Sequence, residues 1–344
     1  MQTLVSDTTA TVTDRLQRPL RDLRISVTDR CNFRCSYCMP ADTFPQTYAF
    51  LHRADLLRFE EITEVARACV RLGVHKIRLT GGEPLLRKDL PALVRMLSEE
   101  TGVGDIALTT NGVLLPRSAE ALRKAGLKRI TVSLDALNDS IFRAMSGVDI
   151  PVEAVLAGIA AAEAAGFHPL KINAVIRRGF NESEILPLVE HFRGTGHILR
   201  FIEYMDVGTC NHWRREEVVT GREIIEQIAH RYPLYPVEPQ CFGEVARRYA
   251  FTDGAGEIGI IASVSQPFCG GCTRLRLSAD GRLYTCLFAR EGMDLRPLVR
   301  GDKAPDAIEK AIQSLWRQRA DRYSELRDTF GHRIPKVEMF HIGG

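Results

Sequence analysis

A regular alternation of β-like and helical segments, from residue 23 to about residue 230, constrains the fold of this chain more than any other feature. Six strands are predicted, over residues 23–29, 76–82, 105–111, 129–135, 170–176 and 198–204. Amphipathic helical patterns lie between them, and several end on glycine, which commonly terminates a helix. Because parallel strands need long crossover connections, the alternation predicts a parallel sheet, either open or closed into part of a barrel.

The polarity of the strand faces helps to choose between these two architectures. In residues 23–28, Leu23, Ile25 and Val27 lie on one face and polar side chains lie on the other. Residues 76–80 and 129–135 repeat this alternation. Buried parallel strands are normally apolar on both faces, and a closed eight-stranded barrel has an aliphatic interior. We therefore predict a partial (βα)6 barrel with a polar cavity; the alternative is a sheet with one solvated face.

The pattern changes after about residue 232. A Pro-rich segment is followed by three segments that look like antiparallel strands, and the last of these turns at Asp280-Gly281. A terminal helical pattern covers residues 304–323. We predict a flexible N-terminal leader over residues 1–14, a barrel core over residues 15–232, and a C-terminal α+β domain over residues 233–344.

Composition argues against several classes of protein. The net charge is +3 and no long block of Lys or Arg is present, which gives no support to a nucleic-acid surface. The most apolar window, residues 151–167, is interrupted by Glu153 and Glu163 and reads as a packed helix, not a membrane span. Nine cysteines, an odd number, argue against a disulfide framework. With no signal-peptide pattern at the N-terminus, we expect a cytoplasmic protein that acts on neither nucleic acid nor a membrane.

Three cysteines, Cys31, Cys35 and Cys38, follow the first predicted strand with the spacing C-x3-C-x2-C. Three thiolates leave one coordination position open, both on a zinc ion and on a four-iron cluster. The spacing therefore predicts a metal site that binds something else. The alternative is a zinc site completed by a distant His.

A second triplet, Cys269, Cys272 and Cys286, lies in the C-terminal segment with the spacing C-x2-C-x13-C. Again three ligands imply one open position. The alternative here is a zinc ribbon that takes Cys241 or Cys210 as its fourth ligand.

The first triplet, together with TGGEP at residues 80–84 at the end of the second strand, resembles the radical S-adenosylmethionine (SAM) family. This resemblance implies a partial (βα)6 barrel, a [4Fe–4S] cluster and SAM. The second triplet and the tail M-x-x-I-G-G make residues 15–344 similar to one branch of it, the GTP 3′,8-cyclase family of molybdenum cofactor biosynthesis. That branch implies a second [4Fe–4S] cluster in the C-terminal domain.

Five cations at inward or cysteine-adjacent positions indicate a polyanionic ligand: Arg24, Arg78, Lys171, Arg274 and Arg276. The resemblance implies that GTP is contacted by Arg24, Arg78, Thr109, Lys171, Arg274, Leu275 and Arg276. It implies that SAM is contacted by Tyr37, Gly82, Ser133 and Met205. The catalytic residues it implies are Gly343 and Gly344, whose tail would reach into the active site; on sequence alone, a frayed end is equally expected.

The activity that the resemblance implies begins with reductive cleavage of SAM at the first cluster. The 5′-deoxyadenosyl radical takes the hydrogen at C3′ of GTP, and C3′ attacks C8 to give 3′,8-cyclo-7,8-dihydro-GTP, with the guanine held at the second cluster. The partners implied are a one-electron donor of flavodoxin or ferredoxin type and the next enzyme of the pathway, with a homodimer left open. The alternatives are another radical SAM enzyme with an auxiliary cluster, acting on a peptide or small molecule, and a non-catalytic zinc-binding adaptor.

Overall fold

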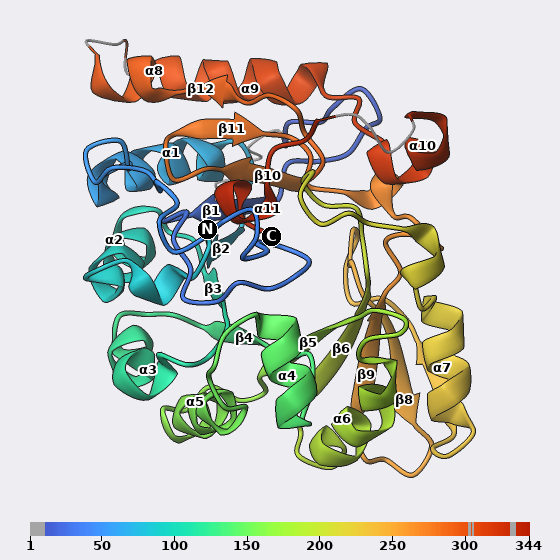
Figure 1. Ribbon diagram of the computed structural model, residues 1–344. Helices are drawn as coiled ribbons and strands as arrows, with labels where there is room; N and C mark the ends of the chain where they lie inside the picture. The colour runs from blue at the N-terminus through green and yellow to red at the C-terminus, as the bar shows by residue number, and fades with distance from the viewer. Residues whose placement is uncertain (1–10, 302–303, 305, 331–334) are drawn as a thin grey trace, which may run out of the picture.

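The computed structural model describes residues 11–301, 304, 306–330 and 335–344. Six parallel strands form the centre of its sheet (Figure 1): β1 (Asp22–Ser26), β2 (Lys76–Thr80), β3 (Asp105–Thr110), β4 (Arg129–Ser133), β5 (Lys171–Ile176) and β6 (Ile198–Glu203). They pair in sequence order, each with the next. The predicted partial barrel is therefore confirmed, and each strand lies within a residue range predicted for it or one residue outside it.

Helices cover the outside of this sheet (Figure 1): α1 (Phe59–Arg71), α2 (Leu90–Glu100), α3 (Leu115–Lys124), α5 (Glu153–Ala164), α6 (Ile185–Phe192) and α7 (Gly221–Ala229). Helix α4 (Asp139–Ser146) instead packs on the loop of the first triplet, where the Arg34 amide donates to the Ser146 carbonyl oxygen. The sequence analysis missed α4, although its end signals are present. The Asn138 side chain accepts hydrogen bonds from the amides of Ser140 and Ile141, and Gly147 ends the helix with φ +66°. Within the described residues, none of the helices combines the length and apolarity that a bilayer span requires.

The C-terminal strands extend both ends of the same sheet: β7 (Leu234–Val237), β8 (Arg247–Phe251), β9 (Glu257–Ile261), β10 (Arg274–Leu277), β11 (Arg282–Tyr284) and β12 (Met293–Asp294). Strands β8 and β9 pair antiparallel, as do β10 and β11. However, β9 pairs parallel with β6, and β10 pairs parallel with β1. The antiparallel interpretation of this segment was therefore incomplete, because it missed both junctions with the barrel.

Four helices complete the described chain: α8 (Arg296–Arg300), α9 (Ala307–Gln318), α10 (Tyr323–Phe330) and α11 (Met339–Ile342). Short 3-10 turns lie at Pro84–Leu86, Glu182–Glu184, Arg215–Glu217 and Cys269–Gly271. Helix α9 packs on α1, and α11 lies against β1 near the centre of the molecule (Figure 1). The C-terminus therefore ends beside the first barrel strand.

The two faces of the barrel strands differ as predicted. Leu23, Ile25, Ile77 and Leu79 are fully buried in the core between sheet and helices. The polar residues that alternate with them point to the concave side. Burial of the aliphatic face drives the sheet against the helices, while the polar face is left to line a cavity.

The N-terminal segment is packed from residue 12 onward. Residues 1–10 of the predicted leader lie outside the described part of the chain. Val12 and Asp14 are 5% and 3% exposed, and Thr13 forms a β-bridge with Pro19. The prediction of a flexible leader over residues 1–14 is therefore wrong at its end. The predicted boundary at residues 232 and 233 stays a prediction.

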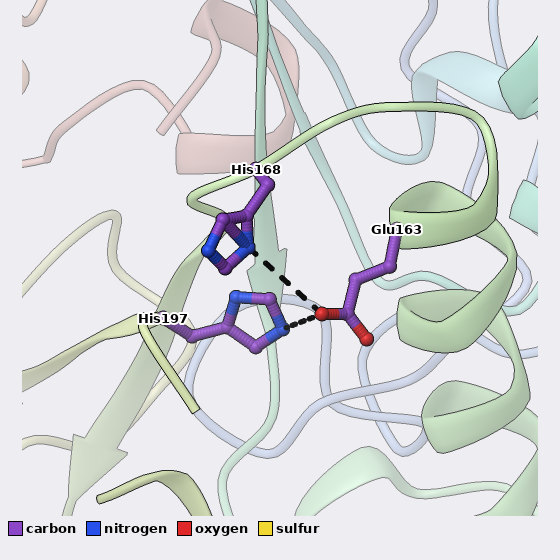
Figure 2. Close-up of side chains that lie close together, drawn as sticks. All are labelled: Glu163, His168 and His197. Carbon is purple, nitrogen blue, oxygen red and sulfur yellow. Dashed lines mark ion pairs between the residues drawn. The ribbon is translucent and has the colours of Figure 1, made fainter. Parts of the chain in front are cut away.

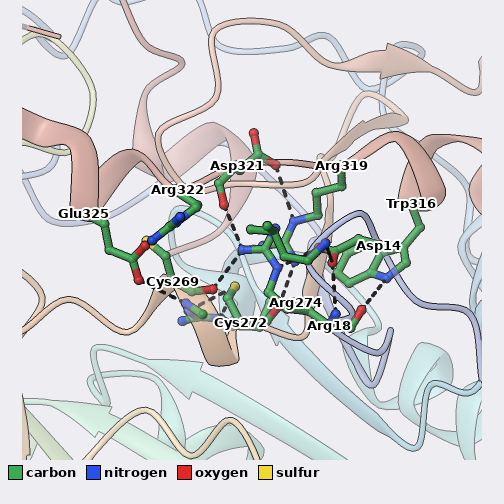
Figure 3. Close-up of polar contacts among 12 residues, drawn as sticks. Asp14, Arg18, Cys269, Cys272, Arg274, Trp316, Arg319, Asp321, Arg322 and Glu325 are labelled. Atoms are coloured by element: carbon green, nitrogen blue, oxygen red, sulfur yellow. Dashed lines mark hydrogen bonds and ion pairs between the residues drawn. The ribbon is translucent and has the colours of Figure 1, made fainter. Parts of the chain in front are cut away.

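A buried ionic network joins this N-terminal hairpin to the second cysteine triplet (Figure 3). Asp14 Oδ2 accepts hydrogen bonds from Arg18 Nε at 2.6 Å and from an Arg319 terminal nitrogen at 3.2 Å. The same two guanidinium groups donate to the carbonyl oxygens of Cys269 and Cys272, at 2.8 and 2.7 Å. The side chains of Asp14, Arg18 and Arg319 are at most 1% exposed. The network thus holds the turn that carries two of the cysteines.

Replacing the carboxylate of this network should be strongly destabilising. In Asp14→Ala, two buried guanidinium groups lose their shared counter-charge, and breaking a buried pair in this way costs about 3–5 kcal/mol. Urea denaturation followed by circular dichroism should show the loss. The matched control is Glu120→Ala, which removes an exposed i,i+4 pair with Lys124 on α3 and should leave the urea midpoint nearly unchanged. Equal midpoints for the two variants would contradict the assignment.

Candidate functional site

A cavity of about 860 Å³ occupies the concave side of the sheet. Each of the six parallel strands contributes an inward side chain to its wall: Arg24, Arg78, Thr109, Ser133, Lys171 and Arg200. Both cysteine triplets line the same cavity. The structure therefore brings the two predicted metal sites to one space.

The first triplet follows β1 at the end of the sheet where the strands terminate. Burial raises the pKa of the Cys31 thiol to about 12 and also raises the pKa values of Cys35 and Cys38. The backbone N–H of Phe33 donates to Cys31 Sγ at 3.4 Å. Three buried thiolates in one place would repel each other, so they need a strongly cationic partner. This donor set fits an iron–sulfur cluster with one open position.

The residues predicted to contact SAM all line the cavity: Tyr37, Gly82, Ser133 and Met205. The Tyr37 hydroxyl donates to Asp135 Oδ2 at 2.8 Å, and Asp135 Oδ1 accepts from the Val175 amide at 2.8 Å. Burial raises the pKa of Asp135 to about 6. Position 82 excludes any side chain, because a Cβ there would lie 2.3 Å from the carbonyl oxygen of Arg30.

Glu83 of the TGGEP segment has a structural task that the sequence analysis did not assign. Its carboxylate accepts hydrogen bonds from the Asn111 amide at 2.8 Å, the Leu85 amide at 3.0 Å and the Thr110 hydroxyl at 2.7 Å. It thereby ties the loop after β2 to the loop after β3. Burial raises the pKa of Glu83 to about 7. The carboxylate fixes the backbone that presents Gly82 to the cavity.

The second triplet lies across the cavity, beside β10. Burial alone would raise the pKa of the Cys272 thiol, but Arg274 and Arg319 lower it to about 6. Arg274 donates to Cys272 Sγ from two nitrogens, at 3.4 and 3.3 Å. Burial raises the pKa of Cys286 to about 12. These three thiols also fit a cluster with one open position.

The two cysteines considered as a fourth ligand lie in different places. Cys210 is buried, and its Sγ lies 3.9 Å from the carbonyl oxygen of Cys38 and 3.0 Å from Glu338 Oε2, on the side of the first triplet. Cys241 is exposed and lines the cavity. Cys210 therefore cannot serve as the fourth ligand of a zinc ribbon with the second triplet.

A row of arginines crosses the cavity wall. Arg24 on β1 is in register with Arg78 on β2 and with Arg276 on β10. Burial lowers the pKa of Arg24 far below its usual value, and the neighbouring Arg276 and Arg274 lower it further. Burial, with Arg274, lowers the pKa of Arg276 to about 10. Adjacent buried cations of this kind favour an anionic ligand.

On the six parallel strands, the cavity wall contains three cations that the sequence analysis did not name: Lys76, Arg129 and Arg200. Arg200 has the inward parity of β6, so the strand pattern could have found it. Burial, with Arg78 and Arg129, lowers the pKa of Arg200 to about 9. Lys76 and Arg129 begin β2 and β4, and they share the inward parity of Arg78 and Ser133, so the strand pattern could have found them as well.

Leu275 differs from the other residues predicted to contact GTP. Its side chain is fully buried in the apolar core, on the face of β10 opposite to Arg274 and Arg276. Among the described residues, the cavity wall includes both arginines but not Leu275. A contact through the Leu275 side chain is therefore not supported, for the same reason of strand parity that places the arginines inward.

The C-terminal tail lies inside the cavity. Arg276 donates a hydrogen bond to the carbonyl oxygen of Gly343, and Gly344 lines the cavity. Gly343 has φ +76°, and a Cβ on it would lie 2.4 Å from Thr80 Cγ2. The expectation of a frayed end is therefore wrong for these residues, and position 343 leaves no room for a side chain.

A second group of potential metal ligands, Glu163, His168 and His197, lies where β5 and β6 begin (Figure 2). His197 Nδ1 accepts a hydrogen bond from the Leu170 amide at 3.3 Å, so neutral His197 carries its proton on Nε2. Nε2 faces Glu163 Oε1 at 3.2 Å. A metal at Nε2 would require the other tautomer, with two N–H groups opposed. The arrangement is therefore a polar contact that ties α5 to the sheet.

Two parts of the chain match known families. Residues 25–192 match the Radical SAM superfamily, and residues 197–325 match Molybdenum Cofactor Synthesis C. SuiB of Streptococcus suis, solved with S-adenosylmethionine bound, is similar in fold, with a TM-score of 0.58 at 15% identity over 94% of this chain and 76% of that one.

Over nearly its whole length the chain is similar to proteins named GTP 3′,8-cyclase. The one from Xanthomonas campestris pv. campestris is 56% identical over 97% of this chain and 98% of the relative. The one from Acidothermus cellulolyticus is 54% identical over 98% of this chain and all of the relative. The one from Staphylococcus epidermidis is 45% identical over 97% of this chain and 99% of the relative.

Anion binding in the cavity should depend on pH through Lys171. Burial and the neighbouring Arg200 lower the pKa of Lys171 to about 7. A bound polyphosphate stabilises the ammonium form and raises that pKa, so affinity should fall as pH rises through 7. We expect calorimetry to show that the affinity for inorganic triphosphate falls by up to about tenfold between pH 6 and 8. This fall is measured relative to Lys171→Arg, in which the side chain stays charged over that range. Identical pH profiles for the two proteins would show that Lys171 does not titrate against the anion.

Proposed function

The chain belongs to the GTP 3′,8-cyclase family of radical SAM enzymes, and on this premise we propose how its cavity divides the reaction between two cysteine sites. The activity is that of molybdenum cofactor biosynthesis. One observation carries the proposal: the two triplets face a single cavity, with the row formed by Arg24, Arg78 and Arg276 beside them. A nucleotide held by that row lies within reach of both triplets.

The first triplet is the radical-generating site. Cys31, Cys35 and Cys38 hold the [4Fe–4S] cluster that the family requires, and when bound this cluster supplies the electron that cleaves SAM reductively. The lack of a side chain at Gly82 lets the loop after β2 pack against the backbone of Arg30, and the backbone of this loop borders the place of the SAM amino group. Tyr37, Ser133 and Met205 border the rest of the SAM site, and the Tyr37–Asp135 hydrogen bond fixes the position of the ring.

The second triplet is the site that selects guanine. Cys269, Cys272 and Cys286 would hold a second [4Fe–4S] cluster, which would supply a binding site for the base. Support comes from Arg274, which donates to Cys272 and would help keep that sulfur a thiolate. The Asp14 network holds the turn on which Cys269 and Cys272 lie.

The cationic wall binds the rest of GTP. Arg24, Arg78 and Arg276 lie side by side and suit multidentate contact with phosphate oxygens or the ribose. The Thr109 hydroxyl accepts a hydrogen bond from Arg78 at 2.9 Å and so orients this guanidinium group. Lys171, together with Lys76 and Arg200, extends the positive wall for the triphosphate. Holding C3′ and C8 in attack geometry is then the contribution of these residues to forming 3′,8-cyclo-7,8-dihydro-GTP.

The tail completes the site. Gly343 and Gly344 are the catalytic residues, since Gly344 lines the cavity and position 343 leaves no room for a side chain. The Gly343 carbonyl oxygen is held by Arg276 of the cationic wall. A peptide-modifying radical SAM enzyme is the second candidate, but a cavity with this many cations and an inserted tail favours a nucleotide. The electron donor, the next enzyme of the pathway and a homodimer remain expectations.

Iron analysis tests the two cluster sites. Anaerobically reconstituted protein should carry about eight irons, as two four-iron clusters. Replacing Cys31, Cys35 and Cys38 by Ala should remove about half of the iron and all formation of 5′-deoxyadenosine. The matched variant, with Cys269, Cys272 and Cys286 replaced by Ala, should lose the other half yet still cleave SAM, without cyclising GTP. SAM cleavage by the first variant would overturn its assignment.

Removal of the last two glycines tests the role of the tail. The truncated protein should keep its iron and bind GTP with nearly unchanged affinity, but form no cyclised product in mass spectra. A Gly343→Ala, Gly344→Ala variant should behave alike, because the new methyl group at position 343 would clash with Thr80. A free peptide that ends in Gly-Gly should partly restore the truncated enzyme. Full turnover by the truncated protein without the peptide would show that Gly343 and Gly344 have no catalytic role.

A further inference from the structure

We propose that Glu338 and Lys336 are positioning residues that clamp the C-terminal tail onto the loop after β6, and thereby hold Gly343 and Gly344 in the cavity. The inference rests on the proposed function, because the clamp matters to the reaction only if Gly343 and Gly344 are catalytic. It is carried by a separate set of contacts, made by residues that lie six and eight positions before Gly344.

The Glu338 carboxylate is held by the loop on both oxygens. Its Oε1 accepts hydrogen bonds from the Thr209 amide at 2.9 Å and the Thr209 hydroxyl at 2.7 Å, while its Oε2 lies 3.0 Å from Cys210 Sγ. Gly208 makes room for it: a Cβ at position 208, where φ is +63°, would lie 2.0 Å from Oε2. A loop that offers three donors and omits a side chain is shaped to receive a carboxylate.

Lys336 forms the second contact of the clamp. Its Nζ donates to the Asp206 carbonyl oxygen at 2.6 Å and to Asp206 Oδ2 at 2.7 Å. The Lys336 and Asp206 side chains are 3% and 6% exposed. Asp206 Oδ1 also accepts a hydrogen bond from Arg327 at 2.8 Å. One buried carboxylate therefore joins the tail and α10 to the end of β6, and buried charged hydrogen bonds are the strong ones.

The clamp lies on the side of the first triplet, whereas the tail ends on the side of β10. Beyond Glu338, Phe340 packs with Met39 and Phe44 in a small apolar cluster that Cys38 borders, and the Phe340 and Phe44 rings meet edge-on with centroids 5.0 Å apart. At the far end, Arg276 donates to the carbonyl oxygen of Gly343. The tail thus spans the cavity, and the single short helix α11 separates its two attachments.

This geometry couples the SAM side of the cavity to the position of the tail. The clamp residues bind to residues 206–210, which directly follow Met205, and both Met205 and Val207 line the cavity. Order in this loop therefore favours docking of the tail, and docking favours order in the loop, since coupling between two sites is reciprocal. Displacement of a positioned group by about 1 Å can cost on the order of a hundredfold in rate. Loss of the clamp should accordingly reduce cyclisation more than binding.

The experiment compares Glu338→Ala and Glu338→Gln with wild-type protein and with the truncated protein that lacks Gly343 and Gly344. We expect iron content to be unchanged, GTP affinity to stay within about twofold, and cyclised product per 5′-deoxyadenosine to fall at least tenfold in Glu338→Ala. Glu338→Gln should fall less, because its amide oxygen can still accept from Thr209. Hydrogen exchange of residues 339–344, followed by mass spectrometry, should be faster in Glu338→Ala.

Two further variants keep the test decisive. Lys336→Met removes the second contact and should lower the ratio of cyclised product to 5′-deoxyadenosine in the same way. This variant keeps the test valid if Glu338→Ala loses iron. Glu120→Ala removes an exposed carboxylate on α3 and should behave as wild type. The clamp alone would be overturned if Glu338→Ala and Lys336→Met both kept the wild-type ratio of cyclised product to 5′-deoxyadenosine and the wild-type hydrogen exchange, while the truncated protein was inactive. Full cyclisation by the truncated protein would instead overturn the role of the tail, and the clamp with it.

Discussion

The row of arginines across the inner face of the barrel is the constraint on which the rest of the structure depends. Arg24 lies between Arg78 and Arg276 on neighbouring strands, and burial and like charge lower the pKa values of all three. An interior of this kind cannot be filled with aliphatic layers as in a closed barrel. The sheet instead stays open around a cavity, and under the proposed function an anionic nucleotide supplies the missing counter-charge.

The same row requires both ends of the chain to meet at β1. Strand β10 comes from the C-terminal segment, and its parallel pairing with β1 places Arg276 beside Arg24. The hairpin of residues 12–20 then supports the second triplet through Asp14, Arg18 and Arg319 (Figure 3). Segments about 250 to 300 residues apart in sequence therefore form one wall of the site. Such contacts close long loops, so we expect this wall to form late in folding.

The C-terminal tail contacts this wall from the opposite side of the cavity. Its clamp residues bind the loop after β6, and its terminal glycines reach Arg276. The two cysteine triplets, the cationic wall and Gly344 thus line one cavity, so that the proposed radical site and nucleotide site lie in the same space. The polar contact between Glu163 and His197 (Figure 2), where β5 and β6 begin, takes no part in this chemistry and serves the packing of α5.

The sequence by itself determined the features that depend on local periodicity and spacing. Strand parity placed Arg24, Arg78 and Lys171 on the inner face, and two triplets of cysteines predicted two metal sites with an open position. These follow from the backbone geometry of one strand or one loop. Only the tertiary structure decided which strands became neighbours. The pairing of β10 with β1 and the contact of Glu338 with Thr209 each join residues far apart in the chain. They are set by the packing of the whole sheet, not by any local pattern.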